Sequence, residues 1–166
     1  MTPDEFFMRY AYPCSHNLMA LDLVSESDYA KFEKMVSGGK PLPRDFAERI
    51  FHAAFRRIRE TAQKMKINGV WDMRVLTQYW HAEHNRYIGA GDGNYGRQPK
   101  MFCDLCKVYI AEIREKKQTE GKTFFVVQYP YEGSTQTRIV LADQLPEAGV
   151  GDKIRIHSGY AVEFAE

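Results

Sequence analysis

The stretch Gly151-Asp152-Lys153-Ile154-Arg155-Ile156-His157-Ser158-Gly159-Tyr160-Ala161-Val162 decides the fold of the C-terminal part of this chain. Isoleucines alternate with charged residues from Lys153 to His157, which is typical of a strand with one buried face. Ser158-Gly159 predicts a turn, because glycine adopts backbone conformations that other residues avoid. The stretch therefore predicts two successive strands, Lys153–His157 and Tyr160–Phe164, with a histidine just before the turn that joins them.

Further runs upstream have the same strand-like character. They are the alternating run 108–112, the β-branched and aromatic run 124–129, and the run 138–141. Gly, Pro or Asp turns separate the runs, and no helical period lies between them. Five short strands of this kind predict a small antiparallel barrel or sandwich.

The segment before these strands is Phe102-Cys103-Asp104-Leu105-Cys106-Lys107-Val108-Tyr109-Ile110-Ala111-Glu112-Ile113. We expect its thiol pair, Cys103 and Cys106, to lie at the start of a strand. Two cysteines at this spacing can converge on one metal ion. A thioredoxin-type redox pair would instead need a helix N-terminus, where the helix dipole lowers the thiol pKa. The simpler alternative is two small buried residues.

The two quoted stretches resemble the small HypC/HupF hydrogenase-maturation chaperones. That family closes with Gly-Asp-x-Val-x-Val-His-x-Gly-Phe-Ala-Ile, and Gly151–Val162 follows this motif almost residue for residue. Cys103–Ile113 can be laid on the family's opening cysteine and strand without a gap, and Gly133–Leu145 is similar to its middle strand and turn. The likeness covers about residues 103–166 and does not include the N-terminal helical part.

The resemblance implies a small OB-like β-barrel that carries iron on a cysteine, the iron being a fragment of the nickel-iron hydrogenase centre. Cys103 or Cys106 would hold the iron, and His157 would support it as a ligand or a proton partner. A partner protein, either a maturation factor or an apo-metalloenzyme, would take part in the transfer. The family's cysteine lies at a processed N-terminus and precedes a proline, whereas both cysteines here are internal and neither precedes one.

The composition is that of a packed protein with little net charge. In 166 residues, 44% are hydrophobic and 13% aromatic, and 23 Lys plus Arg face 22 Asp plus Glu for a net charge of +1. We therefore expect no general nucleic-acid binding and no membrane association. No apolar run has the length of a membrane span, and the first residues lack the pattern of a secretory signal. The three cysteines are then expected to be reduced thiols in the cytoplasm.

We expect residues 1 to about 100 to form helices. Ser25-Glu26-Ser27-Asp28 carries capping residues that begin a helix, and Ser37-Gly38-Gly39 is expected to end it. Lys40-Pro41-Leu42-Pro43 is expected to be a stiff connector. Two longer helices should follow, at about 44–66, ended by Asn68-Gly69, and at about 70–88.

Together these patterns predict an α+β fold. A helical domain, residues 1–100, should pack as a layer on a small antiparallel OB-like β-barrel, residues 101–166. The oligomeric state is left open by the sequence.

The helical part also contains residues that can bind a metal. His81-Ala82-Glu83-His84-Asn85 places two imidazoles three residues apart, on one face of a helix. Pro13-Cys14-Ser15-His16 places a thiol two residues from an imidazole, in an N-terminal loop or helix start. All three cysteines, and every histidine except His52, lie in these pieces or in the two stretches quoted above.

Three functions are compatible with these patterns. The first is a non-enzymatic accessory protein that carries or inserts a metal centre through a barrel cysteine and His157. The second is a small metalloenzyme with an iron or zinc ion between the helical layer and the barrel. In this case Glu83 would be a candidate base. Some of the following residues would hold the ion: Cys14, His16, His81, His84, Cys103 and Cys106. The third is an OB-like binding module in which Phe124, Tyr129 or Tyr131 stacks on a single nucleic-acid strand, which the near-neutral charge disfavours. We expect an accessory protein rather than an enzyme.

Overall fold

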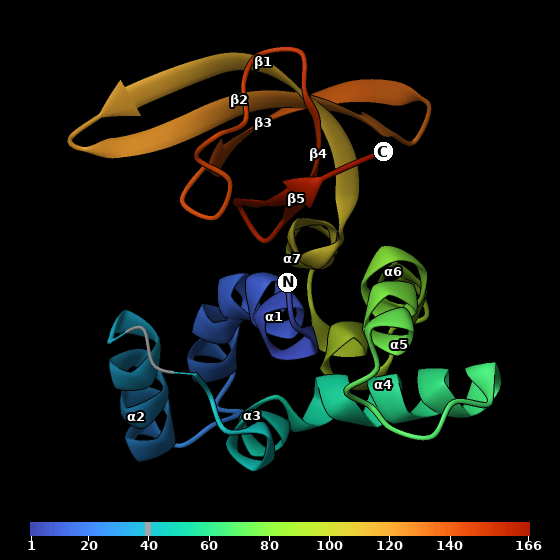
Figure 1. Cartoon of the computed structure of the whole chain (residues 1–166). Helices are drawn as coiled ribbons and strands as arrows, with labels where there is room; N and C mark the ends of the chain where they lie inside the picture. The colour runs from blue at the N-terminus through green and yellow to red at the C-terminus, as the bar shows by residue number, and fades with distance from the viewer. Residues whose placement is uncertain (39–40) are drawn as a thin grey trace. The chain divides into compact units, whose positions relative to one another are not determined.

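Figure 1 shows a computed structural model that describes residues 1–38 and 41–166. The chain divides into two compact units, Met1–Tyr87 and Ile88–Glu166. Helices build the first unit and a closed five-stranded barrel builds most of the second, which confirms the α+β class. Gly39 and Lys40, expected at a helix end and at the start of the connector, lie outside the described residues.

The first helix, α1, spans Pro3–Ala20. It begins with a capping box: the Thr2 hydroxyl accepts a hydrogen bond from the Glu5 backbone N–H, and the Glu5 carboxylate accepts one from the Thr2 N–H. Pro13 lies inside this helix. Cys14 and His16 are therefore in the second half of a long helix, and the expectation of a loop or helix start at these residues is wrong.

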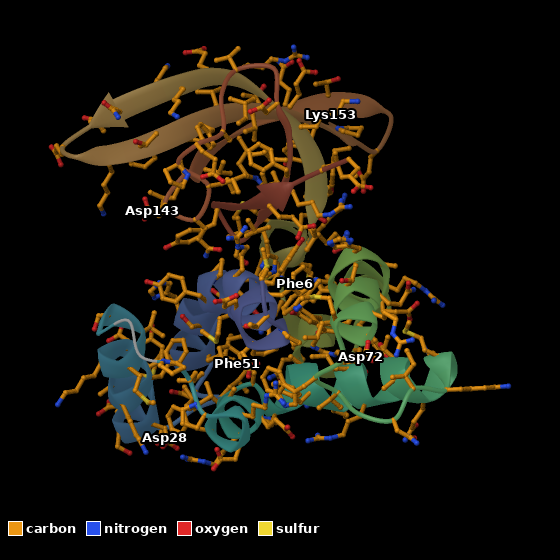
Figure 2. The ribbon with its side chains drawn as sticks, viewed as in Figure 1. Phe6, Asp28, Phe51, Asp72, Asp143 and Lys153 are labelled. Atoms are coloured by element: carbon orange, nitrogen blue, oxygen red, sulfur yellow. The ribbon has the colours of Figure 1, made fainter. Side chains whose placement is uncertain are left out.

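Helix α2, Glu26–Ser37, begins where its capping residues predict. The Ser25 hydroxyl accepts a hydrogen bond of 3.2 Å from the Asp28 backbone N–H. Asp28 itself lies in the first turn (Figure 2), where a carboxylate interacts favourably with the helix dipole.

The long helix expected at 44–66 is two helices, α3 at Arg44–Ile50 and α4 at His52–Met65. The break is at Phe51, whose backbone leaves the helical region at φ −101° and ψ 37°. Its buried ring packs edge-on against Phe7 at 5.5 Å and Phe32 at 5.7 Å. Helix α4 ends at Lys66 in the left-handed conformation, so the chain leaves the helix two residues before the predicted Asn68-Gly69 stop.

The helix expected at 70–88 starts at Met73 and contains a change of type. Helix α5, Met73–Gln78, is capped by Asp72, which is labelled in Figure 2. A π-helix, η1, spans Tyr79–Glu83, and α6 continues from His84 to Gly89. The His84 backbone N–H donates to the Tyr79 carbonyl, five residues earlier, which is the hydrogen bond that defines the wider turn.

Aromatic rings fill the core of the helical unit. Tyr10 and Trp80 stack at 5.1 Å and 16° between ring planes, and Phe7 contacts Phe55 at 4.7 Å. These contacts join α1, α4 and η1, so aromatic packing connects the helices of this unit.

The second unit begins with the 3-10 helix η2, Gly93–Arg97, and the helix α7, Lys100–Cys106. Five strands follow and close in the order β1-β2-β3-β5-β4. They are β1 Tyr109–Thr119, β2 Lys122–Tyr131, β3 Ser134–Leu141, β4 Lys153–His157 and β5 Tyr160–Phe164. Closure leaves no free sheet edge, and the barrel is OB-like as expected.

One pairing in the barrel differs from the antiparallel prediction. Strands β3 and β5 pair in parallel, with Leu141 opposite Tyr160, while the other neighbouring strands are antiparallel. The parallel pairing follows from the long connection between β3 and β4, which lets the last strand return beside β3. The hydrophobic core of the barrel consists of Ala111, Ile113, Phe125, Val127, Tyr129, Val140, Ala142, Leu145, Ala148, Ile154, Ile156 and Ala161.

Candidate functional site

The cysteine pair of the barrel unit lies on a helix. Cys103 and Cys106 are in the last turn of α7, and β1 begins only at Tyr109, so the expected position at a strand start is wrong. The Cys103 N–H donates to the carbonyl of Pro99, which starts this helix. Proline favours a helix start and disfavours helical geometry before it, a signal that the sequence contained. The pair occupies the C-terminal end, where the helix dipole does not lower a thiol pKa.

Cys103 is engaged by η2 and by the residue that follows it. Its Sγ lies 3.6 Å from the Tyr95 carbonyl oxygen and 4.0 Å from that of Gln98, so the thiol donates toward both. Burial raises the pKa of the Cys103 thiol, and the neighbouring Cys106 and Asp104 raise it further. Cys103 is therefore a protonated thiol at neutral pH in this state.

Cys106 and His157 lie on either side of one backbone hydrogen bond. The Ser158 N–H donates a hydrogen bond of 3.1 Å to the Leu105 carbonyl oxygen, which joins the β4–β5 turn to the end of α7. Cys106 directly follows Leu105, and His157 directly precedes Ser158. Both side chains are buried, with exposed fractions of 2% and 0%. A soft thiol and an imidazole thus come from opposite ends of the barrel sequence to one junction, which we call the α7–turn junction.

The turn that carries His157 has a defined geometry. Ser158 and Gly159 both have positive φ angles, 45° and 83°, as in a two-residue hairpin turn between antiparallel strands. His157 pairs with Tyr160 across this turn, and the Leu141 N–H donates to the Gly159 carbonyl at 2.8 Å. The turn is therefore fixed by the pairing of β4 with β5 and by the hydrogen bond from Leu141 of β3, and the turn predicted at Gly159 is confirmed.

A charged residue between the two cysteines is also part of this region. The Asp104 carboxylate accepts a hydrogen bond from the Tyr131 hydroxyl and forms an ion pair of 2.9 Å with Lys107. Burial by itself would raise the pKa of Asp104, but the hydrogen bonds from Tyr131 and Lys107 outweigh it and the pKa is lowered. Asp104 was not among the residues expected to be functional; its spacing of three residues from Lys107 at the end of a helix is the signal that identifies the pair.

The predicted ligands in α1 have different environments. His16 is exposed, and its Nδ1 lies 2.9 Å from the Tyr29 hydroxyl. Cys14 is half-buried in the same helix and forms no disulfide. The two residues are two positions apart, so they point to different sides of α1.

The predicted pair His81 and His84 lies at the π-helix. The Tyr10 hydroxyl is 3.2 Å from Nε2 of His81, whereas the buried His84 ring packs on Trp80 at 4.8 Å and on Tyr79 at 5.6 Å. Each imidazole thus has its own aromatic partner. The nearby Glu83 carboxylate forms ion pairs with Lys64 at 3.2 Å and Arg86 at 2.7 Å.

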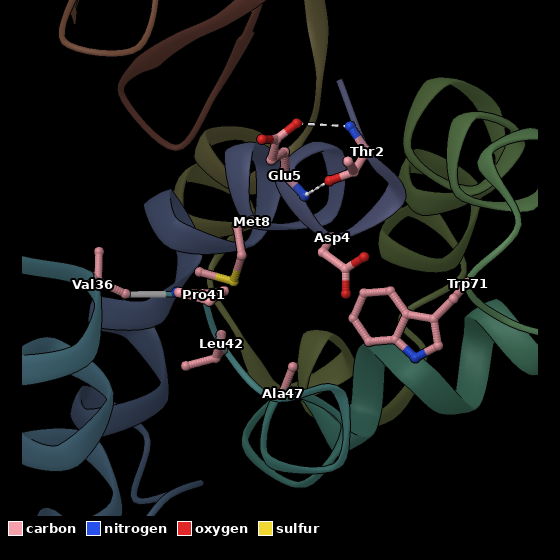
Figure 3. A pocket seen from close by; sticks show the side chains of 9 residues that line it. All are labelled: Thr2, Asp4, Glu5, Met8, Val36, Pro41, Leu42, Ala47 and Trp71. Atoms are coloured by element: carbon pink, nitrogen blue, oxygen red, sulfur yellow. Dashed lines mark hydrogen bonds between the residues drawn. The ribbon is translucent and has the colours of Figure 1, made fainter. Parts of the chain in front are cut away.

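The helical unit also has a pocket of about 540 Å³, drawn in Figure 3. Its lining residues are Thr2, Asp4, Glu5, Met8, Val36, Pro41, Leu42, Ala47 and Trp71. The two carboxylates at this pocket are already engaged, Asp4 by two hydrogen bonds of 2.8 Å from Arg44 and Glu5 by the capping box. The remaining wall is apolar, and no predicted metal ligand lines it.

Comparison with known proteins identifies no relative. No protein-family model matches the chain, no curated protein matches it, and no solved structure matches it. Within residues 1–38 and 41–166, no group of three or more His, Cys, Asp or Glu side chains is arranged to hold a metal ion. In the same residues, no helix has the length and apolar character needed to cross a membrane.

Proposed function

We propose that this protein is a metal-centre carrier in which Cys106 and His157 hold an iron or zinc ion. The observation that supports this most directly is the hydrogen bond from the Ser158 N–H to the Leu105 carbonyl, which places a buried thiol and a buried imidazole on either side of one backbone contact. Thiolate and imidazole together suit iron and zinc better than hard cations. The gapless alignment favoured Cys103 as the ligand, whereas the junction favours Cys106.

A pair of protein ligands suits transfer better than storage. Structural zinc sites close the ion in four protein ligands, and such sites are integral to folding. Two ligands leave coordination positions for small ligands or for a receiving protein. The proposed role is therefore that of an accessory protein, with a maturation factor or an apo-metalloenzyme as its partner.

The resemblance to HypC/HupF chaperones points to iron for hydrogenases as the cargo. The resemblance rests on the same two segments that meet at the α7–turn junction. It indicates the process in which a metal bound by these residues would be used. None of the three cysteines forms a disulfide, which fits the reducing cytoplasm that we propose as the compartment.

Metal loading would require the β4–β5 turn to move away from α7. Cys106 and His157 are almost fully buried, so an ion can reach both only when the contact between Leu105 and Ser158 opens. The thiol must also lose its proton on binding, and the imidazole must be neutral. The proposal therefore predicts faster exchange of the Ser158 amide hydrogen while the metal is being loaded.

Elemental analysis of anaerobically purified variants tests the proposal. Wild type is expected to bind one iron or zinc ion per chain, and Cys106→Ser and His157→Gln are expected to lose it. Cys103→Ser is the matched control, because it removes a thiol from the same helix and should keep the metal. Full metal content in Cys106→Ser, or a wild type that binds no first-row metal ion under these conditions, would refute the carrier.

A further inference from the structure

A second cluster lies on the inner side of strands β1, β2 and β3. Arg138 pairs with Val127, a fully buried core residue, so both side chains are on the same face of the sheet. Tyr109 is on the inward face of β1, two residues before the core residue Ala111. We call Tyr109, Tyr129 and Arg138 the Arg138 cluster.

The charge of Arg138 is held against aromatic rings. Its guanidinium carbon lies 5.0 Å from the ring centre of Tyr129 and 5.7 Å from that of Tyr109. The two rings contact each other at 4.7 Å. A cation over two tyrosine faces is stabilised by the ring quadrupoles, but this interaction does not satisfy the N–H donors of the guanidinium.

Two polar atoms of the cluster are buried without a hydrogen-bond partner. They are Nη1 of Arg138 and the hydroxyl oxygen of Tyr109. Burial and then the nearby Asp104 raise the pKa of Tyr109, so its hydroxyl keeps its proton and can donate. Buried donors in native proteins are nearly always satisfied, and leaving one unmade costs free energy. Two such donors in one cluster can both serve a single acceptor group.

The carboxylates beside the cluster already have cationic partners. Asp104 pairs with Lys107, and Glu132 accepts two hydrogen bonds from Lys100 at 2.7 and 2.9 Å. Arg138 forms no ion pair with any residue in the described part of the chain. Arg138 is therefore the cationic side chain of this cluster that has no carboxylate partner among residues 1–38 and 41–166.

We propose that the Arg138 cluster binds a carboxylate. The guanidinium would donate from Nη1, the Tyr109 hydroxyl would donate beside it, and the tyrosine rings would flank the ligand. Guanidinium groups match carboxylates in geometry. A single unbalanced charge, with Asp104 close by, suits a monoanion better than the doubly charged phosphate. The site uses neither Cys106 nor His157, so it goes beyond the metal-carrier role and stands without it.

Two sources can supply this chemistry: a small free carboxylate and the C-terminal carboxylate of a partner protein. Acetate represents the first, and N-acetyl-phenylalanine, with its carboxylate next to a side-chain ring, represents the second. The full chain, labelled with ¹⁵N, is titrated with each by NMR at constant ionic strength, and inorganic phosphate and N-acetyl-phenylalanine amide serve as competing probes. Both carboxylates should shift the backbone signals around Arg138, and tighter binding of N-acetyl-phenylalanine identifies the peptide terminus as the source.

Variants connect the binding to the cluster. Arg138→Met should weaken carboxylate binding about tenfold or more, and Tyr109→Phe about fivefold, because a charged and a neutral hydrogen bond are lost respectively. Arg138→Lys keeps the charge and provides a folded variant if the methionine protein is unstable; it should also bind weakly. Arg114→Met is the control, since Arg114 is exposed on β1 and already bonded to Glu112 and Gln128. Equal binding in wild type and Arg138→Met, absence of carboxylate shifts, or preference for phosphate would overturn the proposal.

Discussion

The backbone N–H of Ser158 and the carbonyl oxygen of Leu105 are 3.1 Å apart and form a hydrogen bond that joins the β4–β5 turn to the last turn of α7. The final carbonyls of a helix have no partner within the helix and must find one elsewhere. Here the partner comes from a turn that is more than fifty residues later in the chain. The bond therefore stabilises the helix end and positions the segment that carries the candidate ligands.

Replacing Gly159 with valine should destabilise the barrel unit. Gly159 has a φ of +83°, and a Cβ there would meet no atom within 4 Å, so the cost is backbone strain rather than a clash. A β-branched residue in this conformation should lower the free energy of unfolding by about 1–2 kcal/mol or more. Thermal unfolding followed by circular dichroism measures the change.

Gly149→Ala is the matched control for this variant. Gly149 also has open space around its Cα, but its φ is not positive. Its melting temperature should stay at the wild-type value or rise slightly. A Gly159→Val protein that melts with the wild type would show that the turn does not require its left-handed conformation.

Replacing Asp104 with asparagine should change how stability depends on pH. The pKa of Asp104 is lowered in the folded state relative to 3.8, so the ionised carboxylate stabilises the fold above that value. This contribution is lost as pH falls through the folded-state pKa. Asp104→Asn should lower the free energy of unfolding by about 1.5–3 kcal/mol near neutral pH, because charged hydrogen bonds to Tyr131 and Lys107 are weakened.

The difference between the two proteins should shrink below about pH 4, where the wild-type carboxyl is progressively protonated. Urea unfolding at several pH values between 7 and 2.5 measures it. Tyr131→Phe removes the same hydrogen bond from the other side and should show a smaller loss with the same sign. A difference that is constant over the whole range would mean that ionised Asp104 does not stabilise the fold.

Cys103 should react slowly with alkylating reagents at neutral pH. Burial, Cys106 and Asp104 raise the pKa of its thiol, and only the thiolate is a good nucleophile. The rate of modification by iodoacetamide, followed at Cys103 by peptide mass spectrometry, should keep rising above the pH at which an ordinary thiol is fully ionised. A peptide of residues 100–107 is the reference. Equal rates in peptide and protein at pH 7.5 would contradict the prediction.

The strands and the turn could be predicted from the sequence because their signals are local. Alternation over Lys153–His157 and the glycine after Ser158 require no knowledge of distant residues. The break at Phe51 could not be predicted in this way. Its neighbours continue the helical period, and the interruption comes from packing on Phe7 and Phe32, which lie on two other helices.

The candidate site was likewise only partly predictable, because some of its features depend on tertiary contacts. Cys106 and His157 could be chosen by residue type, but their positions on either side of one backbone hydrogen bond depend on the contact between Leu105 and Ser158, which no local pattern contains. The Arg138 cluster was not predicted, because an arginine in a strand with polar neighbours is expected to be exposed to solvent. Its inward direction follows only from the register that places it opposite Val127.

The histidines of the π-helix test which residues hold the metal. If Cys106 and His157 are the ligands, His81→Ala/His84→Ala should bind the same amount of metal as wild type, with the same fall in affinity as pH drops, because an imidazole ligand must be neutral. Because the buried His84 ring packs on Trp80, the alanine protein should be less stable. His81→Phe/His84→Phe keeps the rings, removes the nitrogen ligands and separates packing from binding. Metal content by elemental analysis, measured across pH, decides the question: a loss of metal in the phenylalanine protein would favour the metalloenzyme with histidine ligands from the helical unit.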